Sequence, residues 1–336
     1  MDESALTEFL LSLPKTETHL HLEGALPWEL LAEYDPERFS EEPAFRNKDF
    51  RYQSFEEFES VLIEHAMLIF DSADSYYEAA KLIFEKHLAQ NVHYVEISFH
   101  AGMIELIKVP GKEILQAILA AVPGELEVRV FLGISRNAYS PYLASHLEDA
   151  IENWDQLSGI DLHGLETLPM EEWTEPFWKK AGVLGKELKA HAGEFGPSGN
   201  VTHAIDNLGV RRIQHGIRAI DNEKVLSRII DTGTTLDICP ISNYKLQVVK
   251  EWSEHPLKNF LGQGIRCTLS TDDPFSFKNN LVQEYETCFE KLSLSVGEIA
   301  TLAKNGFEVA TMDEGMKRSF QQEIDHLTDR FLHSDD

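Results

Sequence analysis

The sequence predicts an α/β protein with the architecture of a closed TIM (β/α)8 barrel, in a single domain spanning residues 1–336. Two observations carry this prediction. Eight short β-rich runs alternate with helix-like segments, and the later runs, marked by His191, His215, Ile238 and Leu269, recur at steps of 24, 23 and 31 residues, which leaves room for one strand, one helix and two loops. Several runs are almost continuously apolar, as expected of parallel strands buried on both faces. A doubly wound open sheet is the competing architecture.

The strands are expected, in chain order, at Thr16–Leu22, Val92–His100, Leu126–Ile134, Gly159–Gly164, Leu188–His191, Arg212–Gly216, Thr235–Pro240 and Arg266–Thr271. One connecting helix is expected at Asn222–Thr232. Its apolar residues Val225 and Ile229 lie one helical turn apart, and Gly233 can end it in a left-handed conformation.

Two segments exceed a minimal barrel. A helical insertion at about 25–90 follows the first strand, with helices expected at Phe55–Phe70 and Ser75–Gln90. Because loops after barrel strands lie at the catalytic face, this insertion could form a lid, and Phe58 and Leu62 could line the wall of a pocket. An equally weighted alternative is that the insertion and these two residues only contribute to core packing. Further helices are expected at about 295–336, outside the barrel.

The composition excludes several classes of function. The 336 residues include 57 Asp and Glu but 30 Lys and Arg, which gives a formal net charge of −27. Such a chain repels nucleic acid polymers and anionic membrane surfaces. The apolar fraction of 43% indicates a globular protein. No apolar run is long enough for a membrane span, and the N-terminal region lacks a secretory pattern. The three cysteines form no CxxC motif. A cytoplasmic location is therefore expected. The oligomeric state stays open.

Polar clusters occur where four of the predicted strands end. In His19-Leu20-His21 both imidazoles point to the same side of the strand. The other clusters are His191-Ala192-Gly193-Glu194, His215-Gly216 and Asp272-Asp273. The carboxyl ends of barrel strands converge on one pocket, where three His and one Asp form a nitrogen and oxygen set suited to Zn²⁺. The alternative, four unrelated structural clusters, requires four separate explanations.

These segments resemble the adenosine/adenine deaminase family of the amidohydrolase superfamily. The similar segments are Pro14 to Gly24, His191 to Glu194, His215-Gly216, Cys239 to Asn243 and Ser270 to Pro274, in the family's order. The resemblance covers roughly Leu13 to Met312. It implies one Zn²⁺ per subunit held by His19, His21, His191 and Asp272.

The resemblance also implies roles around a small-molecule purine. Glu194 would donate a proton to N1, and His215 would position or deprotonate the attacking water. Asp273 would hydrogen-bond N7, and the backbone of Gly164 would lie along the N3 edge. The chemistry agrees, because zinc lowers the pKa of water and a protonated acid near N1 stabilises the adduct at C6.

The expected reaction is hydrolytic deamination of the 6-amino group of an adenosine-like purine nucleoside, releasing ammonia and giving inosine or its analogue. The alternatives are free adenine, giving hypoxanthine, or a modified adenosine such as aminodeoxyfutalosine. The substrate signals are mixed. Glu23, where adenosine deaminases place Asp, resembles adenine deaminases, whereas Gly159–Gly164 resembles the nucleoside-type fourth strand, GIDLxG.

Other polar residues carry weaker expectations. His163 and Glu166 could read a substituent of the substrate, but surface positions are favoured; Arg136 is expected in an ion pair and Glu96 in hydrogen bonds between strands. A two-metal amidase or phosphoesterase would need a Lys at the end of the fourth strand, and Asp161 to Gly164 contains none. A non-catalytic binding protein of this fold would be expected to lack a ligand or Glu194.

Overall fold

The computed structural model describes residues 3–136 and 140–333. Within them, eight parallel strands pair in sequence order, each with the next along the chain. The strands are β1 (Lys15–His21), β2 (Val92–His100), β3 (Glu127–Ser135), β4 (Gly159–His163), β5 (Glu187–Ala192), β6 (Arg212–His215), β7 (Thr235–Ile238) and β8 (Cys267–Leu269). All eight predicted strands are confirmed, with boundaries shifted by a few residues.

The sheet closes on itself between its first and last strands. Leu20 forms a parallel bridge with Asp272, and the Thr18 amide donates to Ser270 Oγ at 3.0 Å. The His21 amide also donates to the Asp272 carbonyl at 3.1 Å. This closure produces the predicted (β/α)8 barrel and rules out the doubly wound alternative.

A layer of buried charges crosses the barrel interior. Glu96 of β2 accepts hydrogen bonds from Arg212 of β6 at 3.1 Å and from Lys189 of β5, as expected for a group linking strands. Asp237 of β7 accepts from Arg212 at 2.9 Å. Burial alone would raise the pKa of Glu96, but the cations of Arg212 and Lys189 hold it below its ordinary value. Every charge in this layer has a partner of opposite sign, which buried charges require.

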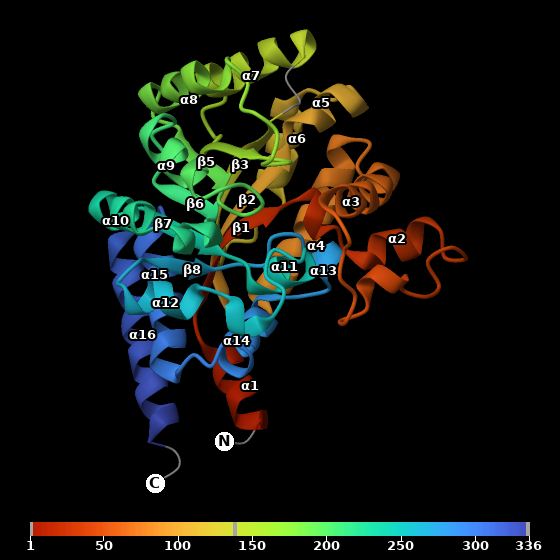
Figure 1. Cartoon of the computed structure of the whole chain (residues 1–336). Helices are drawn as coiled ribbons and strands as arrows, with labels where there is room; N and C mark the ends of the chain where they lie inside the picture. The colour runs from red at the N-terminus through yellow and green to blue at the C-terminus, as the bar shows by residue number, and fades with distance from the viewer. Residues whose placement is uncertain (1–2, 137–139, 334–336) are drawn as a thin grey trace.

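Helices surround the barrel (Figure 1). They are α1 (Glu3–Ser12), η1 (Glu23–Ala25), α2 (Trp28–Tyr34), η2 (Ala44–Arg46), α3 (Phe55–Ile69), α4 (Ala73–Leu88), α5 (Ala101–Ile107), α6 (Gly111–Ala120), α7 (Pro141–Asn153), α8 (Thr174–Val183), α9 (Gly199–Asp206), η3 (Ile217–Asp221), α10 (Glu223–Thr232), α11 (Pro240–Lys245), η4 (Trp252–Glu254), α12 (Leu257–Gly262), α13 (Pro274–Phe277), α14 (Leu281–Glu290), α15 (Val296–Val309) and α16 (Glu314–Leu332). None of these described helices combines the length and apolarity needed to cross a membrane.

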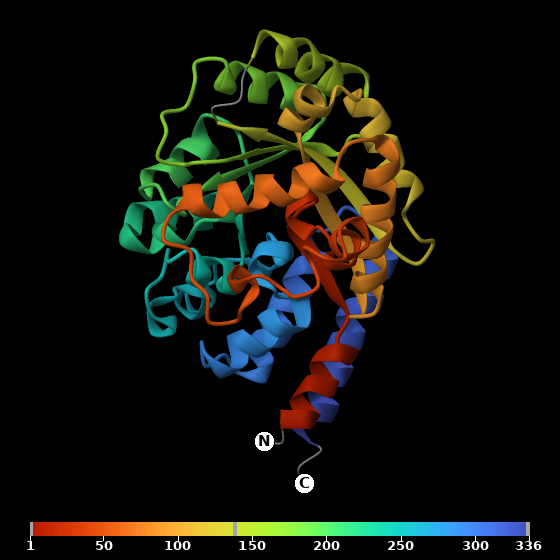
Figure 2. The ribbon, with the colours of Figure 1, turned by 90° about the vertical axis from the view of Figure 1, so that its right-hand side faces the viewer.

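The expected insertion after β1 contains both predicted helices, α3 and α4. Ser54 caps α3 by accepting from the Glu57 amide, and Ser72 caps α4 in the same way. Figure 2 shows α3 running across the front of the barrel. Phe58 of α3 stacks on Phe277 of α13 with ring centroids 5.4 Å apart, which ties the insertion to the segment after β8.

The remaining helical predictions are also confirmed. The side chain of Asn222 caps α10, and Gly233 ends it with a positive φ of 64°. Helix α15 packs against β1 and β8, outside the barrel, and α16 packs against α15. The first helix, α1, was not predicted; its Phe9 stacks on Phe331 of α16 at 4.5 Å, so the two ends of the chain lie side by side (Figure 1).

Candidate active site

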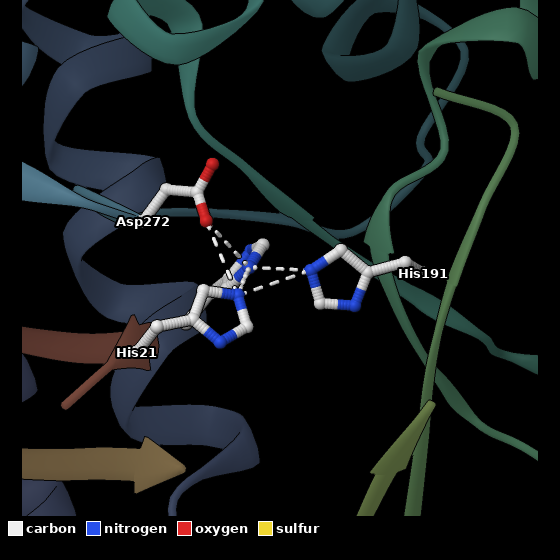
Figure 3. Close-up of side chains that lie close together, drawn as sticks. His21, His191 and Asp272 are labelled. Atoms are coloured by element: carbon white, nitrogen blue, oxygen red, sulfur yellow. Dashed lines mark hydrogen bonds and ion pairs between the residues drawn. The ribbon is translucent and has the colours of Figure 1, made fainter. Parts of the chain in front are cut away.

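Three imidazoles and one carboxylate meet at the C-terminal end of the barrel. The Nε2 atoms of His19, His21 and His191 lie 3.1–3.3 Å from one another. Asp272 Oδ1 lies 3.2 Å from His19 Nε2 and 3.3 Å from His21 Nε2. Figure 3 shows the side chains of His21, His191 and Asp272 pointing toward one another. The structure therefore brings together the four residues expected to hold a metal.

The spacing of these four atoms fits one metal ion. Zn²⁺ bound tetrahedrally at about 2.0–2.1 Å keeps neighbouring ligand atoms about 3.3 Å apart. The separations within the cluster are 3.1–3.3 Å. Without a cation, three lone pairs and a carboxylate oxygen at these distances would repel one another, so the donor set suits a divalent cation.

The other polar atom of each ligand is held by a neighbour, which fixes the ring or carboxylate orientation, as is usual around metal sites. These contacts are His19 Nδ1 with Cys239 Sγ at 3.4 Å, His21 Nδ1 with Ser98 Oγ at 3.1 Å, His191 Nδ1 with the Leu162 carbonyl at 3.0 Å, and Asp272 Oδ2 with Ser242 Oγ at 2.7 Å. Because His191 Nδ1 donates to a carbonyl, its Nε2 is free to act as a ligand.

His215, at the end of β6, lies next to the cluster. Its Nε2 is 3.7 Å from Asp272 Oδ2 and 3.5 Å from Glu194 Oε1. The side-chain amide of Asn243 donates to His215 Nδ1 at 3.1 Å, which places the proton of a neutral ring on Nε2. His215 and Asp272 both have positive φ, 63° and 66°, a strained conformation that directs both side chains into the site.

Glu194 lies in the loop after β5 and is 6% exposed. Its Oε1 is buried and has no hydrogen-bond partner among the described residues. Burial and the negative charges of Asp272, Glu166 and Asp273 raise the pKa of Glu194 well above its ordinary value. The raised pKa favours the protonated form of Glu194, which suits a general acid.

Asp273 presents a second unpartnered oxygen. Its Oδ1 is buried and has no hydrogen-bond partner among the described residues. A Cβ at Gly24 would lie 1.6 Å from this oxygen, so only glycine fits there. Burial and the adjacent charge of Asp272 raise the pKa of Asp273. Buried polar atoms without partners are uncommon in folded proteins, so both carboxyl oxygens point to a missing ligand.

A cavity of about 170 Å³ connects these groups. Eight of the nine site residues expected from the sequence line it, namely His21, Glu23, Gly164, His191, Glu194, His215, Asp272 and Asp273, while His19 contacts them from below. Helix α3 forms the opposite wall with Phe58 and Leu62, so the insertion walls the pocket, and Phe58 is also buried in the core. The roles proposed for these residues remain predictions.

The wall between β1 and β4 is tightly hydrogen-bonded. Glu23 accepts from the Tyr76 hydroxyl at 2.6 Å and from the His100 amide at 3.1 Å. His100 Nδ1 lies 3.1 Å from His163 Nε2. Burial and the nearby charge of His21 lower the pKa of His100 to about 4, and burial likewise lowers that of His163, so both rings are neutral.

Three weaker expectations need correction. Glu166 is not a surface residue: it is 3% exposed and contacts the loop that carries Glu194. His163 faces the cavity instead of the surface. For Arg136, where an ion pair was favoured, the structure shows a hydrogen bond from Nη2 to the His191 carbonyl at 2.7 Å.

Some contacts of the site have little or no signal in the sequence. Ser242 and Asn243 belong to the quoted segment Cys239 to Asn243, so that motif could have pointed to them. Tyr76 and Ser98 lie in a helix and a strand that look ordinary, and only the fold brings them to Glu23 and His21.

The barrel has a cluster that could hold a metal at its C-terminal face, and comparison with known proteins gives the class, a hydrolytic deaminase. The chain belongs to the adenosine deaminase family, whose model, described as "Adenosine deaminase", matches residues 14–327. A relative from Cupriavidus pinatubonensis named adenine deaminase is 30% identical over 336 residues, covering 97% of this chain and 95% of that protein.

Two solved structures share the fold. An adenine deaminase from Arthrobacter aurescens has a TM-score of 0.84 at 24% identity, covering 94% of this chain and 99% of that one. An amidohydrolase from Burkholderia ambifaria with bound Zn has a TM-score of 0.85 at 23% identity, covering 99% and 96%. At these identities the likeness shows the fold alone.

Proposed function

We propose that this protein is a zinc-dependent deaminase that hydrolyses free adenine to hypoxanthine and ammonia. One observation carries the proposal: two buried carboxyl oxygens without partners, Glu194 Oε1 and Asp273 Oδ1, belong to the same small cavity as the metal-binding cluster. In adenine, the ring nitrogens N1 and N7 lie on either side of C6, which carries the amino group. With Glu194 at N1 and Asp273 at N7, each of the two carboxyl oxygens gains a hydrogen-bond partner.

The metal supplies one part of the chemistry. Zn²⁺ in this cluster would act as a Lewis acid and lower the pKa of water. The nitrogen and oxygen donors His19, His21, His191 and Asp272 suit zinc, and the related Burkholderia ambifaria structure has bound Zn.

The protein's own groups supply the proton transfers. As water adds at C6, electron density moves onto N1, where the protonated Glu194 donates its proton. The Nε2–H of His215 donates a hydrogen bond to the attacking oxygen and orients it. The C6–N6 bond then breaks: one proton of the water joins the amino group, which leaves as ammonia, the other returns to Glu194, and the oxygen stays on C6.

Two observations support the free base over a nucleoside. With N1 at Glu194 and N7 at Asp273, the N3 and N9 edge faces the wall between β1 and β4. Glu23, His100 and His163 line the cavity on that side and hydrogen-bond one another or Tyr76, so polar protein groups meet the edge at which a nucleoside carries its ribose. The relatives of about 30% identity are also named adenine deaminase. Adenosine is the second candidate, because Gly159–Gly164 keeps the GIDLxG pattern of nucleoside-type enzymes.

Ultraviolet spectra of the zinc-loaded protein mixed separately with adenine, adenosine, deoxyadenosine and 5′-substituted adenosines would test the proposal. We expect a spectral shift with ammonia release for adenine, and kcat/KM for adenine at least 100-fold above that for adenosine. A higher kcat/KM for adenosine would contradict the free-base assignment. No reaction with any of these compounds would contradict the proposed function.

A further inference from the structure

The loop after β5, Gly193 to Gly196, contains Glu194 and closes around a buried carboxylate from another loop. Glu166, which follows β4, is 3% exposed. Its Oε1 accepts from the Gly193 amide at 2.5 Å and from Asn200 Nδ2 at 2.9 Å. Its Oε2 accepts from the amides of Glu194 and Gly196, each at 2.8 Å. Four N–H groups thus point at one carboxylate, and both of its oxygens act only as acceptors.

Two glycines in the loop allow its backbone to contact the Glu166 carboxylate. Gly193 has a positive φ of 71°, which lets successive amides turn toward the same point. A Cβ at Gly196 would lie 2.7 Å from Glu166 Cδ, so a larger residue there would push the carboxylate away. The two glycines of the His191 to Gly196 segment therefore serve the contact with Glu166.

The position of Glu194 depends on this backbone anchor because its own carboxyl group is weakly held. Its Oε1 has no hydrogen-bond partner among the described residues, and His215 Nε2 is 3.5 Å away. Two further contacts reach the loop, because the Arg218 amide donates to the Gly193 carbonyl at 2.7 Å and Phe195 contacts the Phe55 ring of α3, but neither involves Glu194 itself. The amide of Glu194 itself is one of the four donors to Glu166.

We propose that Glu166 is a positioning residue, which fixes the 193–196 loop so that Glu194 reaches the reacting ring nitrogen. This inference rests on the proposed role of Glu194 in deamination. The negative charge of Glu166 has a second effect that also supports proton donation by Glu194. Together with burial, Asp272 and Asp273, it raises the pKa of Glu194 and keeps the proton that Glu194 donates.

The test compares Glu166→Gln with Asn200→Ala in the zinc-loaded protein, using whichever 6-aminopurine the wild type deaminates fastest. In Glu166→Gln, an amide NH₂ replaces an acceptor and opposes two backbone N–H groups. We expect kcat to fall at least 100-fold, as for a misplaced catalytic group, with KM within about threefold and zinc retained. Asn200→Ala removes one donor and leaves the three backbone contacts, so kcat should stay within about threefold.

The pH profile separates positioning from simple support of the fold. Without the Glu166 charge, Glu194 should lose its proton at lower pH, which moves the alkaline limb of the kcat profile to lower pH in Glu166→Gln. Glu166→Asp keeps the charge and should leave that limb in place. Asp272, Asp273 and His215, which also face Glu194, are unchanged in these variants. A loss of activity that matches the loss of folded or zinc-loaded protein, with an unchanged profile, would overturn the inference.

Hydrogen exchange on the wild-type protein provides a test that needs neither a folded variant nor a known substrate. The amides of Gly193, Glu194 and Gly196 should exchange at least 100-fold more slowly than an unstructured loop. Exchange at the unprotected rate would overturn the inference. If the wild type is inactive on every 6-aminopurine but these amides are protected, the proposed function fails while the anchoring stands.

Discussion

Glu194→Gln is the substitution that tests the proposed chemistry most directly. Glu194 is buried, and its raised pKa favours the neutral acid form of the native side chain. Glutamine has nearly the same shape and is also neutral, so the fold, the metal cluster and the contacts of the loop backbone should all be preserved. The substitution removes one property, the ability to transfer a proton.

The expected loss follows from that single change. A positioned general acid contributes about 10²–10⁴-fold to the rate, or about 3–5 kcal/mol of transition-state stabilisation. We therefore expect kcat to fall by about 10²–10⁴-fold. KM should change by less than about threefold, because the glutamine NH₂ can still donate a hydrogen bond to N1 of the bound purine.

The same substitution should lower activity but should not lower the stability of the fold. A carboxyl whose pKa is raised by folding contributes stability below its unfolded pKa of about 4.3, and this contribution is lost as pH rises toward the folded-state value. Burial is the largest cause of the shift at Glu194. Because glutamine does not titrate, Glu194→Gln should be at least as stable as the wild type, with an advantage in Tm that grows between pH 5 and pH 8.

The assay combines steady-state kinetics, metal analysis and thermal unfolding on one preparation. Glu64→Gln, a substitution of an exposed residue of α3, provides the control and should change kcat by less than twofold. Three results would refute the reasoning: an unchanged kcat in Glu194→Gln, a loss confined to KM, or a Tm that falls below that of the wild type as pH rises.

The remaining predictions concern the metal and the far wall of the cavity. His191→Ala removes one of the four proposed ligands, so purified protein should lose most of its zinc by elemental analysis; full occupancy would contradict the ligand assignment. Ser242→Ala removes the hydrogen bond to Asp272 Oδ2 and should weaken zinc binding by about 10–100-fold in a chelator competition, and an unchanged Kd would show that Ser242 does not tune the site. Glu23→Asp shortens the side chain that meets Tyr76 and the His100 amide, so the ratio of kcat/KM for adenine and adenosine should change; an unaltered ratio would remove Glu23 from substrate selection.

Chain order and periodicity left a barrel and a doubly wound sheet as alternatives, and the polar clusters at the strand ends, with the family resemblance they support, favoured the barrel and the gathering of its site. His19, His191, His215 and Asp272 each follow or end an apolar strand, and parallel strands present those ends at one face. Once the strands are assigned, the convergence of these side chains can be predicted without knowing any interatomic distance. This is why the metal cluster could be expected from single-residue positions, whereas the precise partners of each ligand could not.

Contacts between loops that are distant in the chain could not be predicted from the sequence pattern. Glu166 resembles a solvent-exposed acid after a strand, and its burial depends on the backbone turn of residues 193–196. Tyr76 reaches Glu23 from a helix 53 residues away, and its position in α4 marks it only as an aromatic core residue. Such contacts arise from three-dimensional packing, which local propensity and hydrophobic periodicity do not encode.

The buried charge layer explains how the site keeps its strained geometry. Positive φ at His215 and Asp272 is unfavourable by about 1–3 kcal/mol each, and such strain persists only where the surrounding structure is rigid. Lys189 Nζ donates to the Thr18 carbonyl at 2.8 Å and also bonds Glu96, so β1 is tied to β5 and β2 directly below His19. Arg212 extends the same layer to β6, three residues before His215. Because these ion pairs and the hydrogen bond to Thr18 tie β1, β2, β5 and β6 together below the site, the charge layer helps to hold His19, His191 and the strained His215 in position.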